Sequence, residues 1–476
     1  MPRSSESIPV AANKWWVMAA VAMGIFLSTI DGSIVNVALP TLTRELGAPF
    51  AAVQWVVLAY LLVIVSLMMV AGRLADVYGK KRLFAAGFVI FTLGSLLCGL
   101  SPTVVALVAS RVVQAVGASL LMALGAAIVT EVFPAQERGR AMGFIGMMVS
   151  VGLISGPTLG GLILGSFSWH AIFFVNLPLG VLGTALVLRV VPSSLAASHQ
   201  PFDLHGALLL FTTLLSFLLA ITLGPQAHFS KPVFAGLVAL AFVCGVAFIR
   251  TEVAIEHPLV DLGIFRNSTI ATNVMTGVLV FVASAGLVFL LPFFLQNVQG
   301  RTPREAGLLL ITGPLMIGLS SPLSGWLSDR VGTRPLTALG LSVLVVGYVL
   351  VSTLRADTSP LAYVSRVAWV GLGMGIFQSP NNSAIMGSVP RNRLGVASGL
   401  LSLTRTLGQT TGVALIGALW ATLVRLHGVH ALDAARAPVA AQLAALQWVA
   451  RFIAFIVCIA LAIAVTSWAK TRRRGR

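Results

Sequence analysis

Charge is scarce in this sequence. Only 9% of its 476 residues are charged, whereas soluble domains carry about 25%. Hydrophobic residues make up 57% of the chain, and the mean hydropathy is +0.96. No hydrophilic block is long enough for a soluble catalytic domain, and the apolar runs suit helices of ~20 residues that cross a bilayer. The sequence therefore predicts an all-α polytopic membrane protein.

Groups that bind metals, form disulfides or hold nucleotides are also few. The three cysteines lie in separate apolar runs, where small apolar filler is their expected role, and the seven histidines are scattered. Nothing resembles the nucleotide-binding pattern G-x-x-x-x-G-K-[ST]. We therefore expect no cofactor and no metal site. A membrane enzyme, which needs such groups clustered at one membrane face, is disfavoured.

Fourteen segments are predicted to span the membrane. Their approximate limits are 15–40, 51–72, 83–101, 103–130, 141–164, 171–190, 204–223, 232–250, 268–292, 305–327, 336–354, 361–387, 395–424 and 446–469.

Basic residues outnumber acidic ones, 31 to 14, which gives a net charge of +17. With the N-terminus inside, 20 basic residues fall in segments on that side and eight on the other. Basic residues concentrate in cytoplasmic loops, so both termini are predicted to be cytoplasmic. The membrane explains this excess, and we expect no nucleic-acid partner.

The two ends of the chain resemble each other at a nearly constant offset. "GRLADVYGKKR" (72–82) parallels "GWLSDRVGTRP" (325–335), and "SRVVQAVGAS" (110–119) parallels "SRVAWVGLGMG" (365–375). Such duplicated halves are typical of secondary transporters, which carry a site between two bundles and open it alternately to each side. The predicted organisation is a six-helix bundle at 15–190, a linker with two extra helices at 191–267, a second six-helix bundle at 268–469 and a basic cytoplasmic tail at 470–476.

Two motifs suggest moving parts. The first follows span 2, recurs in the second half and is interpreted as a latch that holds the inner ends of the halves together in one state. Its candidate residues are Gly72, Asp76, Gly79, Lys80, Arg82, Glu131 and Asp329. The second is "GLISGPTLGG" (152–161) in span 5, where small residues four apart allow close helix packing and a proline favours a bend. A hinge and a merely well-packed helix pair both fit the residues Gly152, Gly156, Pro157, Gly160 and Gly161.

Taken in order, the motifs resemble those of the major facilitator superfamily, and specifically of its fourteen-span drug:proton antiporters (the EmrB/QacA type). The latch motif resembles the loop signature of the superfamily, and "RVVQAVGAS" its span-4 signature, with Ala115 in place of the usual glycine. "GLISGPTLGG" resembles the span-5 signature associated with antiport. "LSTIDGSIVNVALP" (27–40), "PLVDLGIFRN" (258–267) and "LPFFLQNVQG" (291–300) resemble segments of the fourteen-span group. The resemblance covers residues 15–469 and implies export driven by a proton gradient.

Asp31 is the one acidic residue deep in a predicted span. It lies nine residues before Pro40, which is ~13.5 Å along a helix and near the middle of a ~30 Å hydrocarbon core. Arg111 lies at a similar depth in span 4, so the two side chains can meet. Burial favours the neutral form of a carboxyl group and a nearby guanidinium favours its charged form, which suits a proton-coupling site. The alternative is a fixed ion pair that only orders the bundle.

Polar residues in spans 1, 2, 4, 9, 12 and 13 are candidates for a substrate cavity, with helix–helix hydrogen bonding as the alternative for each. They are Asn36, Gln54, Tyr60, Gln114, Asn273, Gln296, Trp369, Gln378, Asn381, Arg405 and Gln409. Together with Arg111 and Arg366, Arg405 places three positive charges in the spans against one deep acid. The arginines either satisfy neighbouring polar groups or meet a neutral, zwitterionic or anionic substrate, and we expect dications to be poor substrates.

The sequence thus predicts a proton-coupled exporter of amphipathic drugs or antibiotics in the bacterial inner membrane. A dedicated exporter of one endogenous metabolite is the alternative. We expect a monomer in the lipid bilayer whose partners are protons and a small amphipathic substrate, with a periplasmic adaptor as a further candidate partner. The residues do not distinguish proton from sodium coupling.

Overall fold

The structure is a computed structural model that describes residues 14–134, 137–192, 204–224, 230–255, 262–389, 394–427 and 433–474. In this part of the chain, 14 helical segments are long and apolar enough to cross a membrane, and no strand occurs. The all-α polytopic fold predicted from the sequence is confirmed. The helices are α1 (Lys14–Glu45), α2 (Phe50–Tyr78), α3 (Lys80–Gly99), α4 (Val104–Val132), α5 (Arg138–Ser166), α6 (Ala171–Phe174), α7 (Asn176–Val190), α8 (Leu204–Leu223), α9 (Lys231–Ala254), η1 (Leu262–Arg266), α10 (Ser268–Phe293), η2 (Phe294–Val298), α11 (Pro303–Leu310), α12 (Thr312–Val331), α13 (Thr333–Val351), α14 (Pro360–Gly387), α15 (Leu394–His427), η4 (Ala434–Arg436) and α16 (Val439–Arg474).

Two helices run past prolines that the sequence reading placed at span ends. Helix α1 contains Pro40 and continues to Glu45, and α10 contains Pro292 before the π-helical turn η2. A proline removes one backbone donor, a cost confined to one turn of a long helix that neighbouring groups in a membrane protein can offset. The extension matters because it carries Thr41 and Gln296 to the same end of the molecule.

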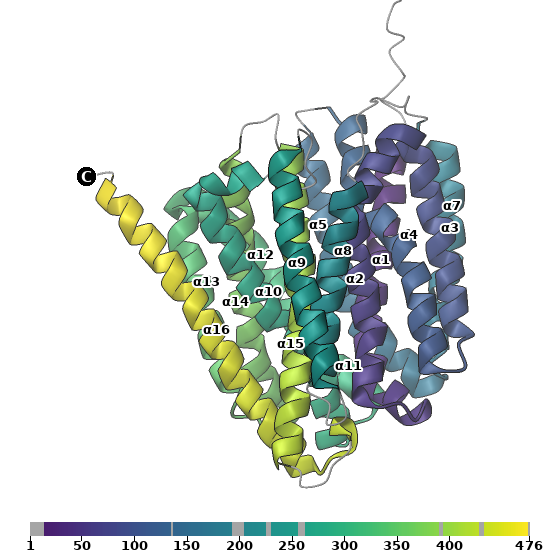
Figure 1. Cartoon of the computed structure of the whole chain (residues 1–476), viewed down its shortest axis with the longest axis vertical. Helices are drawn as coiled ribbons and strands as arrows, with labels where there is room; N and C mark the ends of the chain where they lie inside the picture. Colours follow the sequence, from purple (N-terminus) through teal and green to yellow (C-terminus); the bar gives the residue numbers. More distant parts are fainter. Residues whose placement is uncertain are drawn as a thin grey trace, which may run out of the picture.

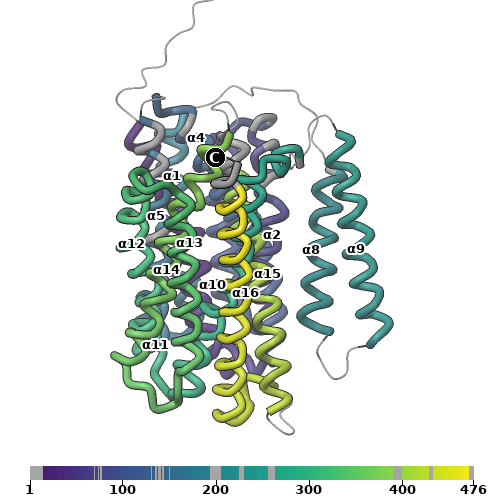
Figure 2. The backbone as a smooth tube through the Cα atoms, turned by 90° about the vertical axis from the view of Figure 1, so that its left-hand side faces the viewer, coloured from purple at the N-terminus to yellow at the C-terminus, as the bar shows by residue number. Residues whose placement is uncertain are grey.

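The helices form two groups with a hairpin beside them. Helices α1–α4 and α7 lie on one side, and α12–α14 with α16 lie on the other (Figure 1). Helices α8 and α9 pair with each other beside the two groups (Figure 2). Helix α8 contacts α2 and α15. We call the end at which α1 begins and α16 ends the terminal end, and the opposite one the distal end.

The repeated loop motif has the same backbone geometry in both groups. Gly79 separates α2 from α3 with φ 89°, and Gly332 separates α12 from α13 with φ 93°. L-residues with a side chain rarely adopt such angles. The glycines of the two motifs therefore occupy equivalent sharp turns between consecutive helices at the terminal end.

Candidate functional site

Asp31 lies at the centre of a buried polar cluster inside the N-terminal group of helices. Arg111 from α4 donates a hydrogen bond through Nη1 to Asp31 Oδ2 and forms an ion pair with it. Gln114 Nε2 donates to Asp31 Oδ1 over 2.8 Å, and Asn176 Nδ2 from α7 donates to the same oxygen over 3.0 Å. None of the four side chains is more than 1% exposed. The carboxylate is therefore bound by three donors from two other helices.

The guanidinium of Arg111 also has several partners besides Asp31. Its Nε donates to the carbonyl oxygen of Val56 over 3.1 Å, and Nη1 donates to Gln114 Oε1 over 2.6 Å. Its carbon Cζ lies 3.9 Å from the centre of the Tyr60 ring. A buried ion pair offsets its desolvation only when further hydrogen bonds support both charges, and several do so here. In this conformation neither charge is accessible to a substrate.

The opposite face of α1 packs against α5. Ser33, two residues after Asp31, donates a hydrogen bond to the carbonyl oxygen of Gly152 over 3.1 Å. A Cβ atom added at Gly152 would lie 2.9 Å from Thr29 Cβ, and one added at Gly156 would lie 2.6 Å from Ser33 Cβ. The glycines of the span-5 motif therefore let α1 and α5 touch through their backbones.

The same helix meets the other group of helices at the distal end. A Cβ atom at Gly161 would lie 2.7 Å from the carbonyl oxygen of Pro303, and one at Gly307 would lie 2.9 Å from Gly161 Cα. Helix α5 thus contacts α1 through one part of the motif and α11 through another.

Hydrogen bonds also join the two groups of helices at the distal end. Gln296 Nε2 donates to the carbonyl oxygen of Val37 over 2.8 Å, and Gln54 Nε2 donates to that of Val413 over 2.6 Å. The backbone N–H of Phe50 donates to Asp433 over 3.0 Å. We call these bonds, together with the Gly161–Gly307 contact, the distal seal.

Aromatic rings reinforce the distal seal. The Phe50 ring contacts those of Phe289, Phe293 and Trp420, with centroid distances of 5.6, 5.2 and 4.9 Å. Among the described residues, every hydrogen bond between α1–α7 and α10–α16 lies in or beside this seal. The hydrogen bonds that join the two described halves therefore lie at the distal end.

The described latch residues lie at the terminal end. Lys80 Nζ forms an ion pair with Glu131 Oε2 at 2.7 Å, which joins α3 to α4 within one half and not across the two. Arg82 and Asp329 are exposed at the terminal end, and no atom lies within 4 Å of a Cβ placed at Gly72. The side chain of Asp76 lies outside the described residues.

Five of the eleven cavity candidates carry polar groups without a partner among the described residues. Asn36 and Asn381 each have a buried side-chain oxygen that accepts no hydrogen bond. Arg405, Gln409 and Gln378 are half-buried and make no hydrogen bond or ion pair within the described part of the chain. We call these residues the interface polar groups, because α1 and α15 contact helices of the opposite half and α14 contacts α15.

The other six candidates lie elsewhere. Gln54 and Gln296 belong to the distal seal, and Tyr60 and Gln114 to the Asp31 cluster. Asn273 donates to the carbonyl oxygen of Thr269 over 2.7 Å within α10.

Trp369 and Arg366, both on α14, also differ from expectation. Trp369 is 42% exposed and lies on the side of α14 away from the buried Met374 and Asn381, so it does not line the interface. Arg366, expected to be deep, is in the second turn of α14 and donates to Thr353 over 3.0 Å and to the carbonyl oxygen of Ala362 over 2.7 Å. Helix periodicity explains both differences, since residues of one helix at similar depth can point in opposite directions.

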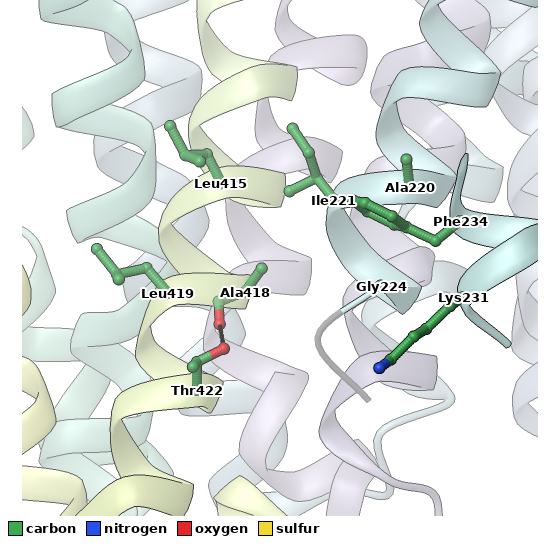
Figure 3. A pocket seen from close by; sticks show the side chains of 9 residues that line it. All are labelled: Ala220, Ile221, Gly224, Lys231, Phe234, Leu415, Ala418, Leu419 and Thr422. Atoms are coloured by element: carbon green, nitrogen blue, oxygen red, sulfur yellow. Dashed lines mark hydrogen bonds between the residues drawn. The ribbon is translucent and has the colours of Figure 1, made fainter. Parts of the chain in front are cut away.

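A separate lateral cavity of ≈ 500 Å3 lies between the α8–α9 hairpin and α15 (Figure 3). Its wall is apolar, and Lys231 and Thr422 supply its polar groups. The Thr422 hydroxyl is used, because it donates to the carbonyl oxygen of Ala418 over 2.8 Å. The cavity borders the outside of the bundle and does not include the interface polar groups.

Residues 21–413 match the Major Facilitator Superfamily. The chain belongs to this superfamily. The riboflavin transporter RibZ of Clostridioides difficile is 36% identical over 410 residues, which cover 86% of this chain and 89% of that protein. The multidrug resistance protein Stp of Mycobacterium tuberculosis (strain CDC 1551 / Oshkosh) is 35% identical and is matched over 85% of this chain and 75% of its own length. The protein is therefore a multi-pass membrane transporter.

Solved structures support the superfamily fold. A bacterial homologue of the human lysosomal transporter Spinster aligns with a TM-score of 0.67 at 16% identity, over 95% of this chain and 96% of that one. A peptide transporter POT variant gives the same TM-score and identity over 97% and 99%. At such identities the likeness concerns the fold of the transporter alone.

Sequence reasoning missed two members of the Asp31 cluster in this transporter. Asn176 donates to Asp31, and Ser95 Oγ accepts from Gln114 Nε2 over 2.7 Å. Both are single polar residues within apolar runs, which was the available sequence signal that they have a polar partner. Ser95 lies in α3 and Asn176 at the start of α7, so only their three-dimensional packing identifies them as partners of Asp31.

Proposed function

We propose that the transporter is a proton-coupled antiporter of the fourteen-span drug:proton type, which exports amphipathic drugs or antibiotics. We place it in the bacterial inner membrane with both termini, and hence the terminal end, in the cytoplasm. The excess of basic residues on that side supports this orientation. We propose that it works as a monomer, with or without a periplasmic adaptor. The distal seal then closes the periplasmic side, and this conformation opens toward the cytoplasm.

The observation that carries the proposal is the Asp31 cluster. An ionised carboxylate accepts hydrogen bonds only, and Asp31 accepts from Arg111, Gln114 and Asn176. Adding a proton turns one acceptor oxygen into a donor and leaves Arg111 without its counter-charge. Protonation therefore weakens the attachment of α1 to α4 and α7.

Helix α1 connects this cluster to the distal seal. Ser33 and Asp31 share one turn of α1, and Ser33 bonds Gly152 of α5 on the opposite face. Helix α5 reaches α11 through Gly161 and Gly307. We propose that protonation of Asp31 from the periplasm and its deprotonation to the cytoplasm bias the rigid α1–α5 pair between two arrangements of the seal. A two-state element biased at one site in this way is what alternating access requires.

The interface polar groups suit amphipathic substrates. They are few, and they come from three helices with largely apolar neighbours, which favours varied hydrophobic ligands with one polar end. The multidrug resistance protein among the relatives supports this substrate class.

A carrier for one endogenous metabolite is the second candidate. It is favoured by the riboflavin transporter among the relatives, which is matched over 89% of its length. The interface polar groups would then recognise one ring system and not a range of compounds.

Transport by purified protein in liposomes separates these functions. A pH gradient is imposed across the liposome membrane, and accumulation of riboflavin and of amphipathic antibiotics is measured with proton, sodium or no gradient. We expect several antibiotics to accumulate with the proton gradient alone. Accumulation of riboflavin only would favour the metabolite carrier, and dependence on sodium or on no gradient would contradict proton coupling.

A further inference from the structure

We propose that Arg405 forms an anion-binding subsite within the substrate site. The transporter would then favour compounds that carry a carboxylate, sulfonate or phosphate on an apolar body. The inference rests on the proposed export function and specifies the substrate class of that same site.

Arg405 lies on α15, a helix that contacts α2 of the other half. Gly408 and Gly412, three and seven residues further along α15, pack against α10, where a Cβ atom at either would lie within 3.0 Å of the α10 backbone. Val413 contacts Gln54 of α2 in the other half. Residues three, four and seven apart share a helix face, so Arg405 lies between the face that touches α10 and the face that touches α2.

Its depth makes the lack of a partner costly. Helix α15 begins at Leu394 and carries no charged residue before Arg405, which lies eleven residues or about 16.5 Å along it. A charge within a membrane costs several kcal/mol unless it faces a cavity or a counter-charge, and such residues are usually functional. Arg405 is half-buried and has no hydrogen bond or ion pair among the described residues.

Among the described residues, no carboxylate forms an ion pair with Arg405. Asp31 is the one deep acid, and Arg111, Gln114 and Asn176 already bind both of its oxygens. The cluster is 0–1% exposed and electrically balanced. The interface therefore presents a net positive charge to whatever enters it, which attracts anions and repels cations.

Neighbouring groups define the rest of the subsite. Gln409 follows Arg405 by one helical turn and also has no hydrogen-bond partner among the described residues. Thr404 Cγ2 and Asn381 Nδ2 lie 3.2 and 3.5 Å from the position of a Cβ on Gly277, so α10, α14 and α15 converge beside Arg405. A guanidinium fork with an amide one turn away matches the two oxygens of a carboxylate or the several of a phosphate.

Two xanthene dyes of similar shape test the subsite. Carboxyfluorescein is anionic and rhodamine 123 is cationic, and their binding to the purified full-length transporter is measured by fluorescence anisotropy. The variants are Arg405→Gln and Arg405→Lys, with Arg366→Gln as a matched control because Arg366 has its own partners at the distal end. Thermal stability without ligand is measured for each.

We expect the wild type and Arg366→Gln to bind the anionic dye more tightly than the cationic one. Arg405→Gln should lose about ten-fold or more of that affinity, as is usual when a charge-assisted hydrogen bond is removed, and Arg405→Lys should keep part of it. Ligand-free Arg405→Gln should be at least as stable as the wild type, whereas a structural arginine would leave it less stable.

Equal affinity of the wild type for both dyes, no binding of the anion, or unchanged anion binding by Arg405→Gln would each overturn the inference. These results are independent of the proton-gradient assay. Proton-driven accumulation of antibiotics without anion preference would support the export function and contradict the anion-binding subsite. Anion binding without proton-driven accumulation would support the subsite and contradict proton-coupled export.

Discussion

Ser33 Oγ donates a hydrogen bond to the carbonyl oxygen of Gly152 over 3.1 Å, from the turn of α1 that also carries Asp31. The two side chains leave α1 on opposite faces, one toward α5 and the other toward α4 and α7. A change in the charge of Asp31 thus acts on a helix whose other face contacts the span-5 motif. Under the proposed function, the span-5 motif is the contact through which α1 moves α5.

Replacing Gly156 with alanine should slow transport. The new Cβ would lie 2.6 Å from Ser33 Cβ and 3.0 Å from the backbone nitrogen of Ile34, so α1 and α5 must separate. Overpacking of this kind costs about 1–3 kcal/mol, and we expect transport rates to fall about ten-fold. The matched control is Gly146→Ala on the same helix, which meets no atom within 4 Å and should transport normally. Equal transport rates for both variants would show that close packing of α1 against α5 is not needed for transport.

Removing the Gln296 amide should open the distal seal more often. Gln296→Ala loses the 2.8 Å bond to Val37 and the 3.5 Å bond with Thr41. A net contribution of about 1 kcal/mol shifts a two-state equilibrium roughly five-fold. Distances between spin labels on the distal ends of α1 and α10 should show more of the separated population. A distribution identical to that of the wild type would show that these bonds do not hold the seal.

The two turn glycines should respond alike to alanine. Gly79 and Gly332 have φ of 89° and 93°, a region in which a Cβ costs about 1–2 kcal/mol. Both variants should lower the thermal stability of the detergent-solubilised protein by a similar amount. Gly72→Ala, which meets no atom within 4 Å inside helix α2, should raise it. Unequal losses at the two glycines would argue that the repeated turns differ energetically.

Neutralising one partner of the Asp31–Arg111 pair should destabilise the fold more than neutralising both. Arg111→Gln leaves Asp31 without its counter-charge in a dry site, and Asp31→Asn does the same to Arg111, at about 3–5 kcal/mol each. The double variant carries no buried charge and should recover part of the loss. Unfolding midpoints in detergent measure this. If the double variant loses as much stability as the two single variants added together, Asp31 and Arg111 are not energetically coupled, which would contradict this prediction.

Much of the fold follows from the sequence because the bilayer restricts the choices. Each apolar run must become a helix, and the predicted limits differ from the observed ones by a few residues, apart from extensions such as α1 beyond Pro40. The fourteen spans and the repeated turn at Gly79 and Gly332 were available from pattern alone.

The site was only partly predictable, because depth is readable from a sequence and direction is not. Asp31 and Arg111 were expected to meet, and they do. Gln54 and Gln296 lie in the distal seal, and Trp369 is 42% exposed and points outward. Asn176 approaches Asp31 only because α7 packs beside α1. Which polar group faces the other half depends on helix rotation, which tertiary packing determines.

The central claim is that Asp31 couples transport to protons, and Asp31→Asn tests it most directly. In liposomes, accumulation driven by a pH gradient is compared with counterflow, the exchange of labelled for unlabelled substrate without a gradient, and the Asp31→Asn/Arg111→Gln variant controls for stability. We predict that accumulation disappears in both variants while counterflow persists. Accumulation at the wild-type level in Asp31→Asn would contradict the account.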